Sequence, residues 1–318
     1  MIGSKARIGI IFGDGAFGCW VRADRIAKRL EKWVKVSLRP FGGEYRNAHF
    51  RNWYDDIYSW IQDNSFDLVI DDQALIGIMA ARASKIPVIS IIQHHPIWAD
   101  TYGEAIQMLQ FADRIAIPMW SWIGDTGLSS LEELKEKIVW TGPIFEELHF
   151  DSILSEANTL LVTEGSAKYD STLFTIARQA AHFLTEWTIR LNEPRALRSS
   201  SAFLPKNCTP MPITDQFSQV LAKSQAVACA GGITMLEAIY CHKTPIVLPV
   251  PLQKEQAWTA EQLASIGLVI KITSDVKARA FAEIVRESVQ DKPSTSFPLE
   301  NGLDRLENIV KELLLCQF

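Results

Sequence analysis

Short apolar runs alternate with amphipathic, helix-like segments along almost the whole of this 318-residue chain. The apolar runs are rich in Ile, Val and Leu and end at turn-forming or polar residues, which is typical of buried strands. They lie at residues 7–12, 34–38, 66–70, 87–92, 114–117, 138–144, 159–162, 187–191, 226–230, 245–250 and 268–272. Parallel strands need a crossover connection, which is usually a helix. The alternation therefore predicts an α/β fold built on doubly wound parallel sheets.

The pattern is interrupted once, near the middle of the chain. The apolar run at 138–144 contains a Gly-Pro break, and an acidic, irregular stretch follows to about residue 157 before the alternation restarts. The chain is also about twice the usual length of one domain. We therefore expect two Rossmann-like domains that face a cleft, residues 1–145 and 146–318. In an alternative arrangement, the last helix of the second half packs back on the first domain.

Composition excludes several classes of protein. The formal net charge is −5 and is spread over both halves, so neither half predicts a nucleic-acid surface. No apolar run reaches the roughly 18 residues of a membrane span. The five cysteines show no C-x-x-C spacing, which argues against a disulfide framework and a zinc site. We expect a cytoplasmic protein, for which peripheral contact with the inner face of a membrane stays open.

Several loops that follow predicted strands carry residues suited to ligands. In doubly wound sheets, ligands bind beyond the carboxyl ends of the strands. Gly13-x-Gly15-x-x-Gly18 has the spacing of a dinucleotide fingerprint, but Leu38-Arg39-Pro40 stands where that fingerprint needs an acidic residue about 20 positions on. The glycine-rich loop therefore favours some other ligand over a dinucleotide.

The stretch at 226–239 has the clearest chemistry. A buried strand runs into Gly231-Gly232, and a helix opens at Ile233 or Thr234. Glycine lets the backbone approach a ligand closely, and the free N–H groups of the helix suit a phosphate. Glu237 falls one turn into the helix, where its carboxylate could accept hydrogen bonds from a sugar diol. The alternative is an ordinary turn with Glu237 on the helix surface; similar loops at 163–167 and 253–256 favour a site.

The segments 231–239, 245–249 and 255–260 resemble the C-terminal domain of GT-B glycosyltransferases. The most similar type is glycosyltransferase family 28, the MurG-like transferases. The resemblance extends over most of the chain. Residues 67–95 follow the pattern of the N-terminal domain, and residues 140–144 look like the interdomain segment. The C-terminal motif is the specific part, and the N-terminal match is looser.

This resemblance implies a UDP-sugar donor that is held mainly by the second half. Gly232, Ile233 and Thr234 would bind the diphosphate through backbone N–H groups and a hydroxyl, and Glu237 would bind the ribose. No cofactor and no metal are implied, because in this fold a helix N-terminus takes the place of a cation against the departing diphosphate.

Four further residues complete the donor site that the resemblance implies. Ser166 would lie near the phosphates, and the main chain of Ile213 would pair with the uracil edge. Glu255 and Gln256 would hydrogen-bond the donor sugar. The acceptor, whether a glycan, a lipid-linked molecule or a small molecule, cannot be read from the sequence. Trp98, Trp120 and Trp122 lie near the rim of the first half, where aromatic faces suit sugar rings or a membrane interface and core packing is the alternative.

The chain departs from the family in the glycine-rich loop of its first half. The family has a histidine directly after the last glycine and an arginine three positions further on; here these are Cys19 and Arg22. That histidine would be the general base. A thiol with an ordinary pKa of about 8.5 is a poor substitute unless a cation or helix terminus lowers the pKa. We expect Cys19 to be a packed, neutral thiol.

Other residues could take the proton from the acceptor. Asp14, the pair Asp71 and Asp72, and His94 or His95 all follow predicted strands of the first half. Histidine suits this role because its pKa is near neutrality. Three functions therefore remain open: a hexosyl- or N-acetylhexosaminyl-transferase, a MurG-like nucleotide-sugar hydrolase, and a non-catalytic partner subunit of a split transferase.

Overall fold

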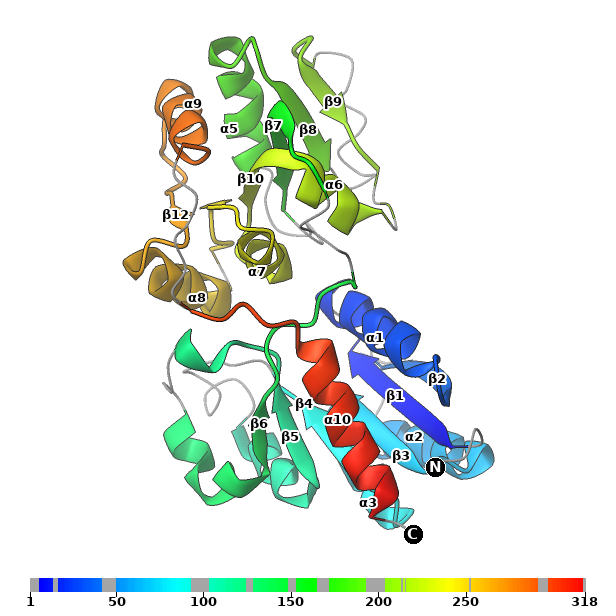
Figure 1. Ribbon diagram of the computed structural model, residues 1–318. Coiled ribbons are helices and arrows are strands. Elements are labelled where there is room, and N and C mark those ends of the chain that lie inside the picture. Colours follow the sequence, from blue (N-terminus) through cyan, green and yellow to red (C-terminus); the bar gives the residue numbers. More distant parts are fainter. Residues whose placement is uncertain are drawn as a thin grey trace. The chain divides into compact units, whose positions relative to one another are not determined.

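The protein divides into two compact units (Figure 1). Unit 1 comprises Met1–Phe145 and Leu299–Phe318, and unit 2 comprises Glu146–Pro298. The last helix of the chain therefore belongs to unit 1. The computed structural model describes residues 6–13, 17–41, 50–92, 103–123, 128–147, 153–164, 172–192, 204–212, 214, 216–251, 253–290 and 297–316.

Unit 1 is built on a six-stranded sheet in the order β2-β1-β3-β4-β5-β6. All neighbouring strands are parallel. The sheet grows outwards from β1 in both directions, which is the doubly wound arrangement. The strands are β1 (Arg7–Gly13), β2 (Lys35–Phe41), β3 (Leu68–Asp72), β4 (Val88–Ile91), β5 (Arg114–Ile117) and β6 (Ile138–Trp140).

Helices connect the strands of unit 1 and supply its core. They are α1 (Phe17–Leu30), α2 (Phe50–Asn64), α3 (Ile76–Ala83), the 3₁₀ segments η2 (Gly103–Phe111), η3 (Ser121–Ile123) and η4 (Leu128–Lys137), and α10 (Gly302–Leu315). The apolar faces of α1 and α10 cover one face of the sheet, where Ile8, Ile70 and Ile91 are fully buried. This contact explains why α10, the C-terminal helix, is part of unit 1 (Figure 1).

Unit 2 repeats the design with the strand order β12-β11-β10-β7-β8-β9. All neighbouring strands are again parallel. The strands are β7 (Glu156–Thr163), β8 (Thr188–Asn192), β9 (Cys208–Pro210), β10 (Ser224–Cys229), β11 (Ile246–Val247) and β12 (Ile270–Lys271). The helices are α5 (Thr172–Ala180), η6 (Ala181–Phe183), α6 (Phe217–Lys223), α7 (Ile233–Tyr240), α8 (Lys254–Ser265) and α9 (Ala278–Glu287).

The core of unit 2 lies between its sheet and the helices α5 and α9. Phe174 and Phe281, one from each helix, are fully buried against Leu160, Ala226 and Ala228. In a strand, alternate side chains point to opposite faces, so Val227 and Cys229 face the other side of the sheet. The carboxyl ends of all these parallel strands lie at one edge, which therefore collects the loops before α5, α7 and α9.

The prediction of an α/β fold with two doubly wound, Rossmann-like sheets is confirmed. The sequence analysis missed β9 (Cys208–Pro210), which is short and lies at the edge of its sheet, and it made β11 and β12 longer than they are. Residues 103–111, between β4 and β5, form the 3₁₀ segment η2 and not an α-helix. Within the described residues, no helix combines the length and the apolarity that a membrane crossing requires.

Candidate functional site

The turn between β10 and α7 is the centre of the candidate site in unit 2. Gly231 has a φ of 95°, in the left-handed region that favours glycine. A Cβ on Gly231 would lie 3.1 Å from Cγ1 of Val247 and 3.5 Å from Cβ of Gln256. Both the backbone conformation and the close neighbours therefore call for glycine here. The chain reaches α7 with little side-chain bulk over the start of the helix.

The N-cap residue of α7 makes no side-chain hydrogen bond to the helix. Gly232 is the N-cap residue in an extended conformation, and its carbonyl accepts from Met235 N at 3.0 Å. The first N–H groups of an α-helix have no partner inside the helix, and the helix dipole adds partial positive charge there. Ile233 and Thr234 are the first two residues of α7. Their N–H groups are thus suited to an anionic ligand.

Gln256, near the start of helix α8, packs beside the Gly231-Gly232 turn. Its Nε2 lies 3.6 Å from the position that a Cβ on Gly232 would occupy, and it donates to Oε1 of Gln253. Its Oε1 is shielded from solvent and accepts no hydrogen bond from any described residue. A buried acceptor without a donor destabilises a protein by about 1–3 kcal/mol. A ligand hydroxyl at this position would relieve that deficit.

Glu237 is buried inside unit 2, with 1% of its surface exposed. It lies on α7 one turn before Cys241, and burial together with the Glu237 carboxylate raises the pKa of the Cys241 thiol to about 12. Lys243 acts in the opposite direction on that pKa. The alternative interpretation of Glu237 as a helix-surface carboxylate is therefore wrong. Glu255, its predicted companion in the donor site, is half-buried in the first turn of α8.

The loop after β7 supplies an acidic residue whose role the sequence analysis missed. Glu164 is buried, and its Oε1 accepts hydrogen bonds from Leu173 N at 2.8 Å and Phe174 N at 3.4 Å. Glu164 thus caps the N-terminus of α5. Two other residues predicted for the donor site, Ser166 and Ile213, lie outside the described residues.

In unit 1, Cys19 is a packed side chain of α1. It is 5% exposed and belongs to the hydrophobic cluster between the sheet, α1 and α10. Its Sγ lies 3.8 Å from Nη2 of Arg22. Arg22 in turn donates from Nε to Oδ2 of Asp72 at 2.8 Å and from Nη2 to Oδ1 at 2.6 Å. The Arg22 guanidinium is therefore committed to Asp72. Burial raises the pKa of Asp72, and Arg22 opposes that rise.

Asp71 lies on the opposite face of the same sheet from Asp72 and makes different contacts. Its Oδ1 accepts from Leu75 N at 2.8 Å and its Oδ2 from Gly77 N at 2.9 Å, so it caps the start of α3. Burial raises the pKa of Asp71 to about 7 against the effect of these N–H donors. Asp71 and Asp72 thus do not share a site. Asp14, His94 and His95, the other candidate bases, lie outside the described residues.

Trp120 is part of the core and not a sugar platform. Its indole Nε1 donates to the carbonyl of Glu300 at 3.1 Å, and the ring is 3% exposed. Trp122 stacks on it with 5.3 Å between ring centroids and 9° between planes. Trp120 therefore stabilises the segment that leads into α10. Trp98 lies outside the described residues.

No protein-family model matches the sequence, and no curated protein matches it. Solved structures do match over almost the whole chain. The glycotransferase of kitacinnamycin is 14% identical with a TM-score of 0.67, over 98% of this chain and 95% of that one. MurG of Acinetobacter baumannii is 15% identical with a TM-score of 0.61, over 96% and 99%.

A third match performs a different reaction on a similar fold. The UDP-GlcNAc 2-epimerase of Methanocaldococcus jannaschii, solved with UDP-GlcNAc and UDP, is 13% identical with a TM-score of 0.63, over 96% of this chain and 99% of that one. At these identities, the likenesses establish the fold: two Rossmann-like units of the GT-B type. They do not assign the reaction, which the same fold supports in more than one form.

Proposed function

We propose that this protein is a glycosyltransferase that takes its sugar from a nucleoside-diphosphate sugar, with UDP as the nucleotide. The observation that carries the proposal is the Gly231-Gly232 turn, where α7 begins without a side-chain hydrogen bond from its N-cap residue and packs beside Gln256. The amide oxygen of Gln256 is buried and accepts no hydrogen bond from the described residues. An anion suits the first feature, and a hydroxyl-bearing group suits the second. A sugar joined to a diphosphate supplies both. The protein would work in the cytoplasm.

In this proposal, unit 2 binds the donor without a metal ion or a cofactor. The N–H groups of Ile233 and Thr234 and the hydroxyl of Thr234 hold the diphosphate. Glu237 accepts hydrogen bonds from the ribose hydroxyls. Gln256 Oε1 accepts a hydrogen bond from a hydroxyl of the donor sugar, and Glu255 lies one residue before it. The positive end of α7 offsets the charge that develops on the diphosphate.

The transfer step follows from these contacts. A hydroxyl or amine of the acceptor attacks the anomeric carbon of the donor sugar and forms the new glycosidic bond. The bond from that carbon to the diphosphate oxygen breaks, and the electron pair leaves with UDP. The acceptor's proton passes to a base, for which Asp14, His94 and His95 remain the candidates. The acceptor itself is a glycan, a lipid-linked molecule or a small molecule, and the transferred sugar is a hexose or an N-acetylhexosamine.

The packing of Cys19 favours one second candidate, a non-catalytic partner subunit. In the resembling family a histidine stands at this position; here Cys19 is buried among apolar side chains beside Arg22. A chain of this kind would bind the nucleotide sugar and leave the proton transfer to a partner. Cys19→Ala tests whether the thiol has a part in the reaction. Unchanged activity would show that the thiol is not the base and that another residue of this chain suffices.

The test is a binding panel followed by a product assay. UDP, GDP, TDP and CDP are titrated against the protein by calorimetry, with UDP expected to bind most tightly. UDP release is then measured from UDP-glucose and UDP-GlcNAc, with and without extracts as the source of acceptor. Release that depends on acceptor supports the transferase. Release without acceptor indicates a hydrolase, isomerised UDP-sugar without UDP indicates an epimerase, and binding without turnover indicates the partner subunit. No binding of any nucleotide would overturn the proposal.

A further inference from the structure

Gln73 lies directly after β3 in unit 1, and its side-chain amide has a donor that is not used. The Nε2 atom is shielded from solvent and donates to no acceptor among the described residues. The backbone of the same residue is held in place, because Gln73 N donates to the carbonyl of Ile91 at 3.1 Å. A buried polar group without a partner destabilises a protein, and a ligand that supplies the missing acceptor reverses this effect.

The backbone conformation of Gln73 is a second unfavourable feature. Gln73 has a φ of 62° and Leu75 a φ of 56°, so two non-glycine residues between β3 and α3 lie in the left-handed region. Residues with a Cβ are destabilised in this region, and such conformations cluster at ligand sites and active sites. Gln73 therefore destabilises the unliganded protein through its backbone as well as through its amide.

Two glycines leave space beside Gln73. β1 and β3 are neighbouring strands, and Phe12 of β1 is level with Asp72 of β3. The next residues, Gly13 and Gln73, therefore lie at adjacent strand ends. A Cβ on Gly13 would meet no atom of the described residues within 4 Å, and the same holds for Gly18 in the first turn of α1. This part of the sheet edge thus has room for a bound group.

The charged groups next to Gln73 favour an uncharged ligand. Asp71 and Asp72 directly precede Gln73, and both are buried. Arg22 donates to both carboxylate oxygens of Asp72, so its guanidinium is already engaged. An anionic oxygen at this turn would lie near two carboxyl groups. A hydroxyl or carbonyl oxygen accepts from an amide N–H without that repulsion.

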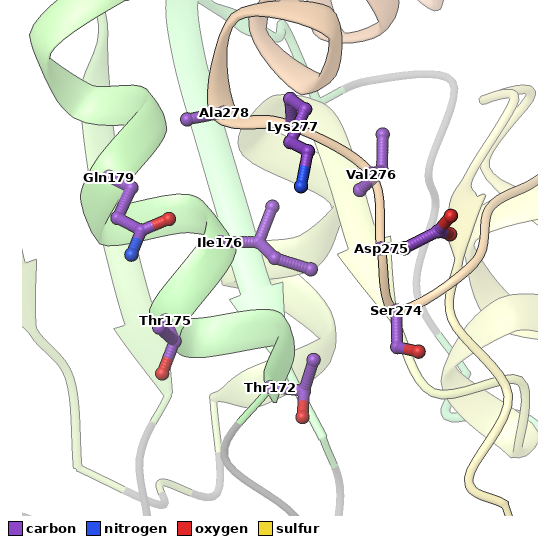
Figure 2. Close-up of a pocket in the computed structure, with 9 residues that line it drawn as sticks. All are labelled: Thr172, Thr175, Ile176, Gln179, Ser274, Asp275, Val276, Lys277 and Ala278. Atoms are coloured by element: carbon purple, nitrogen blue, oxygen red, sulfur yellow. The ribbon is translucent and has the colours of Figure 1, made fainter.

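A pocket in unit 2, between α5 and the segment that leads into α9, lacks such an unused group (Figure 2). A hydrogen bond from Thr273, together with the charge of Lys277, holds the pKa of the Asp275 carboxyl below its usual range. Thr172 and Thr175, which line the same pocket, also have partners. The polar groups of this pocket therefore do not call for a ligand, in contrast to the amide of Gln73.

We propose that the β3–α3 turn of unit 1, residues 73–75, binds an uncharged oxygen of a second ligand, with Gln73 Nε2 as the hydrogen-bond donor. The oxygen belongs to a hydroxyl or a carbonyl group, and the space at Gly13 and Gly18 receives the atoms attached to it. Within the proposed function this ligand is the acceptor. That identification rests on the proposed function, and the binding site itself does not. A carboxylate or phosphate of the ligand is disfavoured at this position.

The amide of Gln73 reports directly on its own ligand in nuclear magnetic resonance spectra of the isotope-labelled whole chain. Its side-chain resonances are identified by their loss in Gln73→Met. The probes are methyl glucoside, which offers hydroxyls, methyl N-acetylglucosaminide, which adds an amide carbonyl, and methyl glucuronide, which adds a charge. Both uncharged probes should shift the Gln73 amide resonances. Methyl glucuronide should shift them less at equal concentration.

Gln73→Met keeps the length of the side chain and removes the amide. It should weaken the binding of methyl glucoside by at least about fivefold, the effect of one lost hydrogen bond. Binding to the variants is followed at the backbone amides of residues 73–75. Gln62→Met is the matched control, because Gln62 lies on α2 of the same unit and its amide already donates to Oγ of Ser84 at 2.7 Å. This control should leave the affinity unchanged.

Gln73→Gly separates a ligand role from a structural one. Glycine suits the left-handed backbone, and the variant also removes the unused donor, so the melting temperature should not fall. The binding of methyl glucoside should weaken as in Gln73→Met. Binding that survives unchanged in both variants would overturn the proposal and make Gln73 a residue of the turn alone.

The outcomes for this site differ from those for the proposed function. A response of the Gln73 amide in a protein that binds no nucleotide would leave this site standing and remove the proposed function. UDP binding without a response of the Gln73 amide to any probe at millimolar concentration would overturn this inference and keep the proposed function. Equal responses to methyl glucuronide and methyl glucoside would overturn the preference for an uncharged ligand.

Discussion

Arg22 and Asp72 form a two-point ion pair inside unit 1, with Nε–Oδ2 at 2.8 Å and Nη2–Oδ1 at 2.6 Å. The guanidinium comes from α1 and the carboxylate from the end of β3, and both side chains are buried. The pair therefore joins the first helix to the third strand at the edge where the loops of unit 1 begin. A bidentate arginine–carboxylate contact also fixes the orientation of both side chains.

Replacing Arg22 alone should destabilise unit 1 strongly. Arg22→Met leaves the Asp72 carboxylate buried without its partner, and breaking a buried pair in this way costs about 3–5 kcal/mol. Chemical denaturation measures the loss as a lower midpoint. The double variant Arg22→Met with Asp72→Leu should recover most of it, because no buried charge is left.

The control for this pair is an exposed one on the same helix. Lys28 and Asp24 lie 2.7 Å apart at an i, i+4 spacing. Lys28→Met should change the free energy of unfolding by less than about 1 kcal/mol, because exposed pairs contribute little. A loss in Arg22→Met as small as that in Lys28→Met would show that the buried pair does not hold α1 to β3.

The junction between residues 141–145 and the start of α10 predicts a second sensitive position. Gly302 N donates to the carbonyl of Pro143 at 2.7 Å, and a Cβ on Gly302 would lie 2.2 Å from the carbonyl oxygen of Gly142. A backbone atom cannot move aside as a flexible side chain can. Gly302→Ala should therefore destabilise the protein by about 1–3 kcal/mol, the usual range for overpacking.

Gly18→Ala provides the comparison. Gly18 lies in the first turn of α1, and a Cβ there would meet no atom within 4 Å. Alanine is the better helix former by about 1 kcal/mol, so this variant should be neutral or more stable. The denaturant midpoint should therefore fall in Gly302→Ala and stay the same or rise in Gly18→Ala. Equal stability of Gly302→Ala and the natural protein would mean that the α10 junction rearranges easily.

The local features of unit 2 could be predicted from sequence because neighbours along the chain create them. The strand, the Gly231-Gly232 turn and the helix follow one another without interruption, and the residue types at each step fit. The alternation of strands and helices likewise fixes the fold class, because a parallel sheet needs its crossovers. Gly231 has a positive φ, and the sequence indicates this conformation because a glycine stands in the strand-to-helix turn.

The long-range pairings could not be predicted in the same way. Arg22 and Asp72 are 50 residues apart, and nothing near either one identifies the other. Glu164 accepts hydrogen bonds from two N–H groups of α5 that lie nine and ten residues further along the chain. This separation exceeds the usual spacing between a capping side chain and its helix. Asp71 and Asp72 are adjacent in the sequence, but the alternation of side chains along a strand places them on opposite faces of the sheet.

Asp71 predicts a pH dependence of stability. Its pKa is raised from 3.8 to about 7, mainly by burial, so the folded protein holds this proton more tightly than the unfolded chain does. Stability from this group is complete below pH 4 and is lost as pH rises towards 7. Over that interval the free energy of unfolding should fall by about 1.4 kcal/mol per pH unit for this group.

Asp71→Asn isolates this contribution. Asparagine keeps the shape and cannot ionise, so the fall in stability between pH 4 and 7 should become shallower in the variant. Chemical denaturation at intervals of pH measures both slopes. Parallel curves for Asp71→Asn and the natural protein would show that Asp71 is ionised throughout.

Glu237 and Gln256 should bind different parts of a UDP-sugar: Glu237 the ribose and Gln256 the donor sugar. Glu237→Gln removes the charge that would accept from the ribose, so it should weaken UDP and UDP-sugar alike, by at least about tenfold. Gln256→Ala keeps the Cβ that packs beside Gly231 and removes the amide. It should weaken the UDP-sugar by about tenfold and leave UDP nearly unchanged, because the amide oxygen would contact only the sugar. Calorimetry with both ligands measures the four affinities.

Stability distinguishes a ligand role of Gln256 from a structural one. Its Oε1 accepts no hydrogen bond from the described residues, so Gln256→Ala removes a buried acceptor and should not destabilise the free protein. Glu261→Gln, further along α8 in an exposed pair with Lys271, should leave both affinities and the stability unchanged. A marked loss of stability in Gln256→Ala, with UDP and UDP-sugar still binding equally, would make Gln256 a packing residue. The sugar would then have to be held by other side chains of the loop at 253–256.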